Sequence, residues 1–392
     1  MYDDLKKEFE AVFGRRAEYI FSAPGRTELG GNHTDHQLGR VLAAAVNLDT
    51  RAAVALNAQR CIHVNSDGYA PVTVALDELE PVPAERETTA ALVRGVAAAV
   101  TAQGYEVPGF DAYVVSTVLP GSGLSSSAAF EVLMGTVMNH LAGARLSAVK
   151  IAQLSKYAEN VYFSKPSGLM DQTASSVGNI VSIDFANADE PKVTPIAFDF
   201  SSSGHALCII DSGADHADLT DDYAAIPREL GAVCCVFGKE HLREVDEAEF
   251  FSRLAEVRAA AGDRAALRAI HIFSDNRRVD AQVNALISGD FAEFLRLVSE
   301  SGRSSWMYLQ NVIPAGGVFH QELALALALT EKLLDGRGAF RVHGGGFAGT
   351  LQAFVPLDML PEFCAGIERV LGAGKCHVLN IRHEGGCLLE KI

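Results

Sequence analysis

The sequence of 392 residues has little positive charge, a single tryptophan and no long apolar run. Its 33 Lys and Arg residues stand against 49 Asp and Glu residues, which gives a formal net charge of −16. Such an acidic surface repels phosphate backbones and anionic lipids, so we expect neither nucleic acid nor a membrane as a partner. No stretch approaches the roughly 20 apolar residues that a membrane-spanning helix requires.

Cysteine is present without the spacings that mark a disulfide framework or a metal site. The seven cysteines form no Cys-x-x-Cys pair and no metal-binding pattern. Most stand in apolar stretches, so we expect buried free thiols in a reducing compartment. The N-terminal residues Met-Tyr-Asp-Asp-Leu-Lys-Lys-Glu are acidic where a signal peptide is basic, and no apolar run follows them. These features predict a cytoplasmic globular protein of two or three domains.

The most informative stretch runs from Leu119 to Ala129 and reads Leu-Pro-Gly-Ser-Gly-Leu-Ser-Ser-Ser-Ala-Ala. Valines before it predict a strand, and apolar residues at i, i+3, i+4 spacing after it predict a helix that Gly143 stops. Glycines let the backbone approach an anion, and the serines lie beside the unpaired N–H groups of a helix first turn. The order is neither a Walker A loop nor GxGxxG. It predicts a phosphate-binding loop, and the alternative is a flexible Gly/Ser linker.

Two further polar segments stand between apolar ones. Residues 23–36 read Ala-Pro-Gly-Arg-Thr-Glu-Leu-Gly-Gly-Asn-His-Thr-Asp-His, which indicates an irregular loop that is either functional or a hairpin bonded to its own backbone. Residues 164–172 read Ser-Lys-Pro-Ser-Gly-Leu-Met-Asp-Gln. Asp171 in this phrase is either the N-cap of a short helix or a carboxylate that acts on a reacting hydroxyl. Glu159, taken alone, is typical of a solvated helical carboxylate.

Together these segments resemble the galactokinases among the GHMP small-molecule kinases. The order Pro-Gly-x-Gly-Leu-Ser-Ser-Ser-Ala-Ala resembles the ATP-binding motif of the superfamily. The galactokinase phrase Gly-Arg-Val-Asn-Leu-Ile-Gly-Glu-His-Thr-Asp-Tyr is matched at Gly25, Arg26, Leu29, Gly31, His33, Thr34 and Asp35. The phrase Gly-x-x-Cys-Gly-x-Met-Asp-Gln is matched at Gly168, Met170, Asp171 and Gln172. Residues 343–349 resemble the third family motif, a Gly-rich turn that we expect to support the site by packing.

The resemblance implies an α+β protein with the two-domain GHMP kinase fold and the active site between the domains. An N-terminal domain of the ribosomal protein S5 domain 2-like type would span residues 1–190, and a GHMP C-terminal α+β domain would span residues 191–392. The implied reaction is ATP-dependent phosphorylation of a sugar, galactose at its anomeric hydroxyl, with ATP as co-substrate and Mg²⁺ as cofactor. The expected partners are the small-molecule sugar and ATP, and the sequence is compatible with a monomer.

The resemblance also assigns roles to single residues. Arg26 and Asp171 would be catalytic, as opposite charges around the reacting oxygens. The metal ligands would be Ser127 and Glu159. The substrate-binding residues would be Asn32, His33, Asp35, Gly168 and Tyr223, although Tyr223 alone is equally typical of a surface aromatic. The ATP-binding residues would be Pro120, Gly121, Ser122, Gly123, Leu124, Ser125, Ser126, Ser127 and Ala128.

Several positions depart from the family phrases. Asn32 stands where the family has Glu, Glu28 where it has Asn, and His343 where it has Thr. Residues 87–89, Glu-Thr-Thr, replace the aromatic start of the family's adenine-side helix. If the family Glu binds the C6 hydroxyl, Asn32 removes a negative charge there, so galacturonate, N-acetylgalactosamine and arabinose are alternative substrates. A non-catalytic sugar- and ATP-binding regulator is a further alternative, but such a protein could lose the loop serines and Asp171, which are all present.

Overall fold

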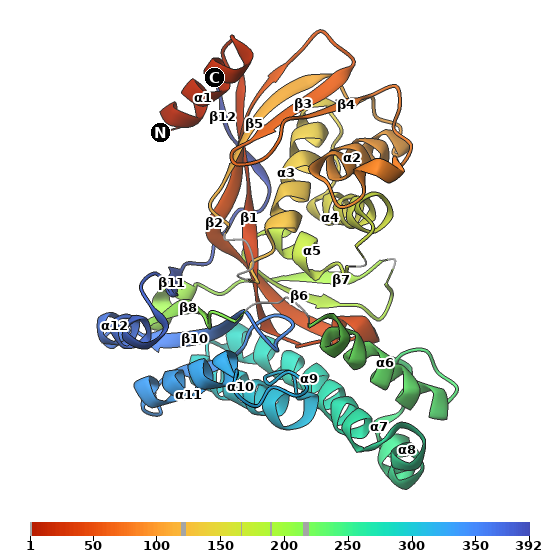
Figure 1. The fold of residues 1–392 in the computed structure, drawn as a ribbon, viewed down its shortest axis with the longest axis vertical. Coiled ribbons are helices and arrows are strands. Elements are labelled where there is room, and N and C mark those ends of the chain that lie inside the picture. The colour runs from red at the N-terminus through yellow and green to blue at the C-terminus, as the bar shows by residue number, and fades with distance from the viewer. Residues whose placement is uncertain (1, 119–122, 166, 189, 215–218) are drawn as a thin grey trace.

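The computed structural model describes residues 2–118, 123–165, 167–188, 190–214 and 219–392. Two bodies of mixed helix and sheet lie one above the other along the long axis of the molecule (Figure 1). Within the described ranges, the upper body is built on an eight-stranded sheet and the lower body on a four-stranded sheet. This content agrees with the α+β class expected from the sequence.

The large sheet is organised around two long antiparallel strands, β1 (Tyr19–Gly30) and β2 (Arg40–Leu56). The other strands are β12 (Cys387–Lys391) beside β1, then β5 (Phe110–Ser116), β3 (Cys61–Ser66) and β4 (Val72–Ala75) beyond β2, with β6 (Ile180–Asp184) and β7 (Lys192–Ile196) continuing from β2. One face is covered by α2 (Thr89–Ala102), α3 (Ser126–Leu141), α4 (Ala148–Tyr157) and α5 (Met170–Val177). On the other face, α1 (Asp3–Phe13) packs Leu5 and Phe9 against the sheet. Alanines such as Ala52 and Ala53 alternate between the two faces, which lets helices pack closely on both.

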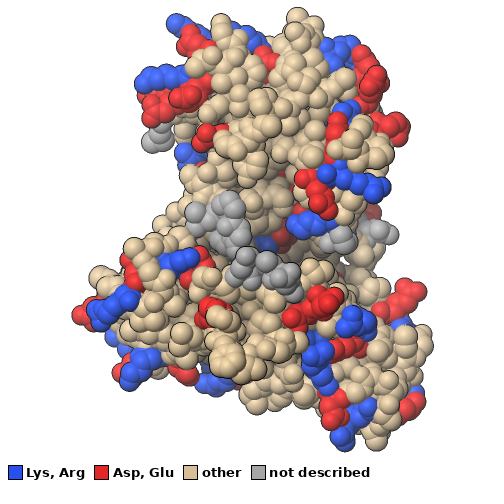
Figure 2. Space-filling model, in the orientation of Figure 1, with Lys and Arg blue, Asp and Glu red and all other residues tan. Residues whose placement is uncertain are grey.

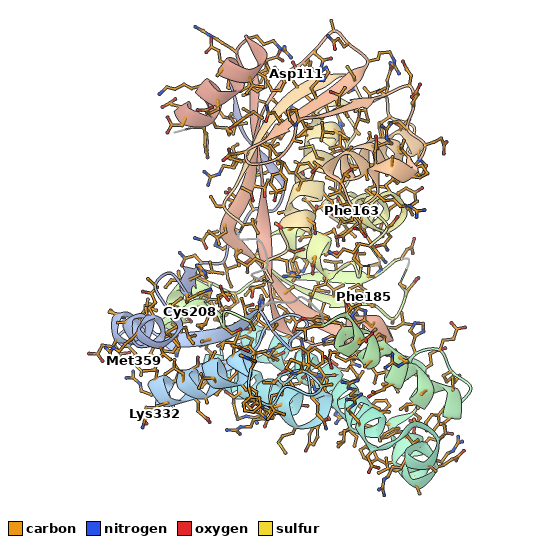
Figure 3. The ribbon with its side chains drawn as sticks, in the orientation of Figure 1. Asp111, Phe163, Phe185, Cys208, Lys332 and Met359 are labelled. Atoms are coloured by element: carbon orange, nitrogen blue, oxygen red, sulfur yellow. The ribbon has the colours of Figure 1, made fainter. Side chains whose placement is uncertain are left out.

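The four-stranded sheet of the lower body is also covered on both faces. Its strands, in spatial order, are β11 (Cys376–Leu379), β8 (His205–Asp211), β10 (Thr350–Pro356) and β9 (Ala339–Val342). Leu207 and Ile209 face α9 (Asp263–Ser288) and α10 (Phe291–Ser304), whereas Cys208 and Ile210 face α11 (Glu322–Leu334) and α12 (Leu360–Leu371). Cys208 accordingly lies in the body that also carries Met359 and α12 (Figure 3). Helices α6 (Thr220–Val236), α7 (Glu247–Ser252) and α8 (Leu254–Ala261) extend outward along α9.

One buried apolar cluster joins the two bodies. Leu29 and Leu42 of the large sheet pack in the same buried cluster as Ile209 and Phe354 of the small sheet and Val279 of α9. The chain also returns at its C-terminal end to the large sheet, where β12 pairs with β1. The division into domains at residue 190 stays a prediction.

Two local expectations were wrong, and one open alternative is excluded. Residues 23–30 are not an irregular loop, because β1 continues to Gly30 and pairs with β2 through two register shifts. Of the two alternatives for Asp171, the N-cap is excluded, because the residue lies in the first turn of α5. Most cysteines are not buried: only Cys208 and Cys234 are, although all seven are free.

None of the helices in the described residues is both long enough and apolar enough to cross a membrane.

Two glycines inside helices give a matched test of the packing. A Cβ added at Gly95 in α2 would lie 2.8 Å from Ala158 Cβ and 2.9 Å from the Tyr162 ring, whereas one added at Gly231 in α6 would meet nothing within 4 Å. We expect Gly95→Ala to lower the free energy of unfolding by about 1–3 kcal/mol through overpacking. We expect Gly231→Ala to leave it unchanged or raise it by up to about 1 kcal/mol. Urea unfolding of both variants measures this, and equal effects would contradict the packing described.

Candidate active site

The residues singled out from the sequence converge where the two bodies meet. The second half of β1, Gly123 before α3, the first turn of α3, the first turn of α5 and the β9–β10 hairpin all contribute hydrogen-bonding groups there. Figure 2 shows the molecule hollowed between its upper and lower parts, with Lys or Arg side chains visible inside the hollow.

Arg26 and Asp171 form a two-pronged ion pair. Arg26 Nε and Nη2 donate to the two carboxylate oxygens of Asp171 at 2.7 and 2.6 Å. Its Nη1 donates to the carbonyl of Gly123. Burial alone would raise the pKa of Asp171, but the charge and hydrogen bonds of Arg26 and a hydrogen bond with Ser125 bring that pKa below its ordinary value. Asp171 is therefore ionised at neutral pH, as the opposite-charge interpretation of this pair requires, and its side chain remains 28% exposed.

The described part of the phosphate loop has the backbone geometry of a tight turn into a helix. Gly123 and Ser125 both have positive φ angles, of 72° and 57°. A Cβ at Gly123 would lie 2.9 Å from the His343 ring, so only glycine fits this approach. Leu124 is buried, and Ser126 and Ser127 open α3 with their side chains partly exposed. Partly exposed hydroxyls at a helix N-terminus suit an anion; Pro120, Gly121 and Ser122 lie outside the described residues.

Glu159 is enclosed by polar partners and is not a solvated carboxylate, because its side chain is 2% exposed. Its Oε1 accepts from Ser127 Oγ at 3.1 Å and from Lys165 Nζ at 2.9 Å. Its Oε2 accepts from Gln172 Nε2 at 2.8 Å, and the same nitrogen reaches Glu131 Oε2 at 3.1 Å. Burial and the nearby Glu159 raise the pKa of Glu131 well above its usual range. Glu131 thus favours its neutral form beside Glu159.

Ser127 and Glu159 supply hard oxygen donors, which is the donor chemistry of Mg²⁺. In the part of the chain that the structure describes, no group of three or more His, Cys, Asp and Glu side chains could hold a metal ion. A metal here would therefore depend on ligand oxygens as well, as Mg²⁺ does when it is bound together with a nucleotide.

Asp35 and His33 lie on the loop that follows β1. A Cβ at Gly168 would lie 2.6 Å from Asp35 Oδ2, so glycine at 168 leaves room for that carboxylate. His33 Nε2 lies 3.0 Å from the carbonyl oxygen of Gly345. Burial and the neighbouring His36 lower the pKa of His33 to about 4, so the ring is neutral and donates this bond from Nε2. His33 is therefore held by the Gly-rich turn, and the Asp35 carboxylate lies against Gly168.

Asn32 is fully buried and its amide is fully engaged. Its Nδ2 donates to Glu28 Oε1 at 3.1 Å and to the carbonyl of Gly344 at 2.7 Å, and its Oδ1 accepts from Asn311 Nδ2 at 2.8 Å. Its role in substrate binding stays a prediction, and this geometry gives the side chain a bracing role in the loop.

Tyr223 is not an isolated surface aromatic. Its hydroxyl donates to the carbonyl of Gly346 at 2.7 Å, and a Cβ at Gly345 would lie 2.7 Å from its ring. Burial raises the pKa of Tyr223 to about 12. The tyrosine therefore packs beneath the Gly-rich turn, and its contact with a sugar stays a prediction.

The sequence did not predict the buried polar network beneath these residues. Arg341 of β9 forms an ion pair with Glu28 of β1, and their side chains are 0% and 5% exposed. His343 Nε2 lies 3.1 Å from Thr27 Oγ1, and its Nδ1 lies 3.0 Å from Thr350 Oγ1. The carbonyls of the Gly-rich turn accept from Asn32, His33 and Tyr223, as given above. The expectation that this turn supports the site is confirmed.

Comparisons with known proteins agree with this geometry. Residues 7–56 match the galactokinase galactose-binding signature, and residues 91–179 match the GHMP kinases N terminal domain. A galactokinase of Streptomyces coelicolor is 29% identical, over 94% of this chain and 92% of its own length. One of Mannheimia succiniciproducens is 31% identical, over 92% of this chain and 91% of its own length. The chain belongs to the galactokinase family.

A solved structure of Lactococcus lactis galactokinase complexed with galactose is 25% identical, has a TM-score of 0.82 and covers 99% of each chain. A mevalonate kinase structure, 14% identical with a TM-score of 0.67, shares the fold. The two bodies of Figure 1 are thus the GHMP kinase fold, and the galactokinase family makes this chain a sugar kinase that transfers phosphate. The galactokinase phrase has Asn and Glu at the positions of Glu28 and Asn32, so this chain carries the two residue types exchanged.

His343 predicts a dependence of stability on pH. Burial, with the charges of Arg26 and Arg341, lowers its pKa from 6.5 to about 3 in the folded protein. Below pH 6.5 the unfolded chain binds a proton at His343 that the folded chain does not. The contribution of this residue to the free energy of unfolding is therefore fully present above pH 6.5 and is lost as the pH falls toward 3. We expect His343→Thr to remove about 1.4 kcal/mol of this loss per pH unit. Urea unfolding between pH 7.5 and 5 measures the slope.

The matched control is His320→Thr, because the His320 side chain is 89% exposed. It should keep the wild-type slope, and a wild-type slope in His343→Thr would contradict the buried neutral ring.

Proposed function

We propose that the protein transfers the γ-phosphoryl group of ATP to the anomeric hydroxyl of galactose, giving galactose 1-phosphate and ADP. The observation that carries the proposal is the two-pronged Arg26–Asp171 pair, bonded through Arg26 to Gly123 at the mouth of the phosphate loop. It is supported by the galactokinases that are 29–31% identical and by the likeness to a galactokinase complexed with galactose.

Each residue of the site has a separate role in a direct transfer of the phosphoryl group, without a covalent intermediate. Ionised Asp171 accepts or orients the proton of the attacking hydroxyl, and Arg26 opposes the negative charge on the reacting oxygens. The loop serines and the first-turn N–H groups of α3 bind phosphate oxygens, and Asp35 and His33 bind sugar hydroxyls. Mg²⁺, when bound with ATP, would be held by Ser127 and Glu159 and would neutralise phosphate charge.

The sugar is the less constrained part of the proposal, because of Asn32. The carboxylate that the family phrase carries at this position stands instead at Glu28, where Arg341 encloses it. The Asn32 amide is bonded to Glu28, Gly344 and Asn311, and position 32 of the site carries no charge. This favours a second candidate, an anomeric kinase for galacturonate, N-acetylgalactosamine or arabinose.

We also propose a cytoplasmic protein with residues 1–190 and 191–392 as its domains, and the site is compatible with a monomer. Seven free cysteines support a reducing compartment. The site needs no second chain for Arg26, Asp171, Ser127 and Glu159, since one chain brings all four together.

A substrate panel tests the choice of sugar. The purified protein is assayed for ADP release with Mg·ATP and galactose, galacturonate, N-acetylgalactosamine, arabinose or glucose. We expect galactose to give the highest kcat/KM. A higher kcat/KM for galacturonate would move the assignment to the second candidate, and silence with every sugar would contradict both and favour a non-catalytic regulator.

Replacing Asp171 tests the mechanism. We expect Asp171→Ala to abolish turnover, because the positioned proton acceptor is lost. The expected decrease in kcat is about 10²–10⁴-fold or more. ATP binding, measured calorimetrically without sugar, should stay largely intact. Asp111→Ala is the control, since Asp111 pairs with Arg15 near the far end of the upper body (Figure 3). Near-normal turnover in Asp171→Ala would refute its role.

A further inference from the structure

Lys165 reaches the active site through an unusual turn of the backbone. Residues six apart do not share a face of a regular α-helix. Here the π-helical turn η3 (Ala158–Phe163) is followed by Ser164 in a left-handed conformation, with φ 70°. The Lys165 N–H then donates to the Glu159 carbonyl at 3.1 Å, and its Nζ donates to Glu159 Oε1 at 2.9 Å. The backbone bond places Lys165 beside this carboxylate, and the side-chain bond pairs the ammonium with it.

The two partners of this ion pair differ in their freedom to move. The Glu159 side chain is 2% exposed, whereas that of Lys165 is 55% exposed. Glu159 is also held by Ser127 and Gln172. The ammonium has three donor hydrogens, of which one suffices for Glu159. The lysine can therefore turn to a ligand without any change in the position of Glu159.

A nucleotide bound at the phosphate loop requires a local positive charge, which the Lys165 ammonium can supply. The protein has a net charge of −16, so its overall field repels a nucleotide. Among the described residues, Arg26 and Lys165 are the cations that pair with Asp171 and Glu159. Arg26 already uses three nitrogens on Asp171 and the Gly123 carbonyl. Lys165 is thus the cation beside the loop that still has donors to offer.

We propose that Lys165 binds the phosphates of ATP, and that its ammonium leaves Glu159 for them when Mg·ATP binds. This rests on the proposed function, because it assigns Ser127 and Glu159 to Mg²⁺. In the free protein the ammonium competes with a metal ion for Glu159. In the nucleotide complex the backbone bond to Glu159 keeps the ammonium within reach of phosphate oxygens. The two states predict opposite effects of removing the charge.

The test measures binding without sugar, so no turnover occurs. Lys165→Met keeps the apolar stem and removes the charge, and Lys165→Arg keeps the charge. Calorimetry should show Mg·ATP binding about 10–100-fold weaker in Lys165→Met and within a few-fold of wild type in Lys165→Arg. Mn²⁺ alone, a paramagnetic stand-in for Mg²⁺ followed by electron paramagnetic resonance, should bind more tightly to Lys165→Met. Lys192→Met, at an exposed position of β7, should change neither.

Several results would overturn the proposal. Wild-type affinity for Mg·ATP in Lys165→Met would reduce Lys165 to an ion-pair partner of Glu159. Weakened binding that Lys165→Arg does not restore, with both variants folded by circular dichroism, would point to lost packing instead of lost charge. If the protein binds nucleotide but releases no ADP with any sugar, the proposed function is refuted and the role of Lys165 in phosphate binding is not. A wild-type protein that binds no Mg·ATP would refute both.

Discussion

Strand β1 is buried along almost its whole length, and it carries charged side chains. A charge in such a position requires a partner with matching hydrogen bonds, because desolvation without one is strongly unfavourable. Arg26 forms an ion pair with Asp171 on α5, and Glu28 forms one with Arg341 on β9. Through these two ion pairs, α5 of the upper body and β9 of the lower body both contact β1. The position of the active site between the bodies follows from how the charges of β1 are satisfied.

What the sequence could predict was local. The helix after the loop serines, the Gly-rich turn and the phrase that contains Asp171 all carry signals within a few residues. The Glu28–Arg341 pair joins residues 313 positions apart, and no periodicity or spacing records such a contact. The polar composition of residues 23–30 indicated a loop, yet pairing with β2 made it a strand, which is tertiary structure overriding propensity.

The turn at Ala158–Phe163 shows the same limit at the site itself. Its residues carry no pattern that distinguishes a π-helical turn from the end of an α-helix, so Glu159 resembled a solvated carboxylate and Lys165 had no assigned role. The structure instead encloses Glu159 between Ser127, Lys165 and Gln172. Irregular helical turns often occur at functional sites, because they change which side chains meet. A site of this kind can be inferred from motif order, but its electrostatics require the fold.

The exchange of Glu28 and Asn32 relative to the family phrase is best understood as one change. Asn32 Nδ2 donates to Glu28 Oε1, so the amide and the carboxylate are bonded to each other in this chain, where their positions are reversed relative to the family phrase. A buried Glu at 28 is tolerable because Arg341 pairs with it, and Asn32 is tolerable because Gly344 and Asn311 satisfy its amide. Burial nevertheless raises the pKa of Glu28 above its ordinary value, against the lowering effects of Arg341 and Asn32. Relative to the family phrase, the carboxylate thus stands at residue 28 in the strand and not at residue 32 on the loop that follows β1, so a change of sugar preference would follow from the position of the carboxylate.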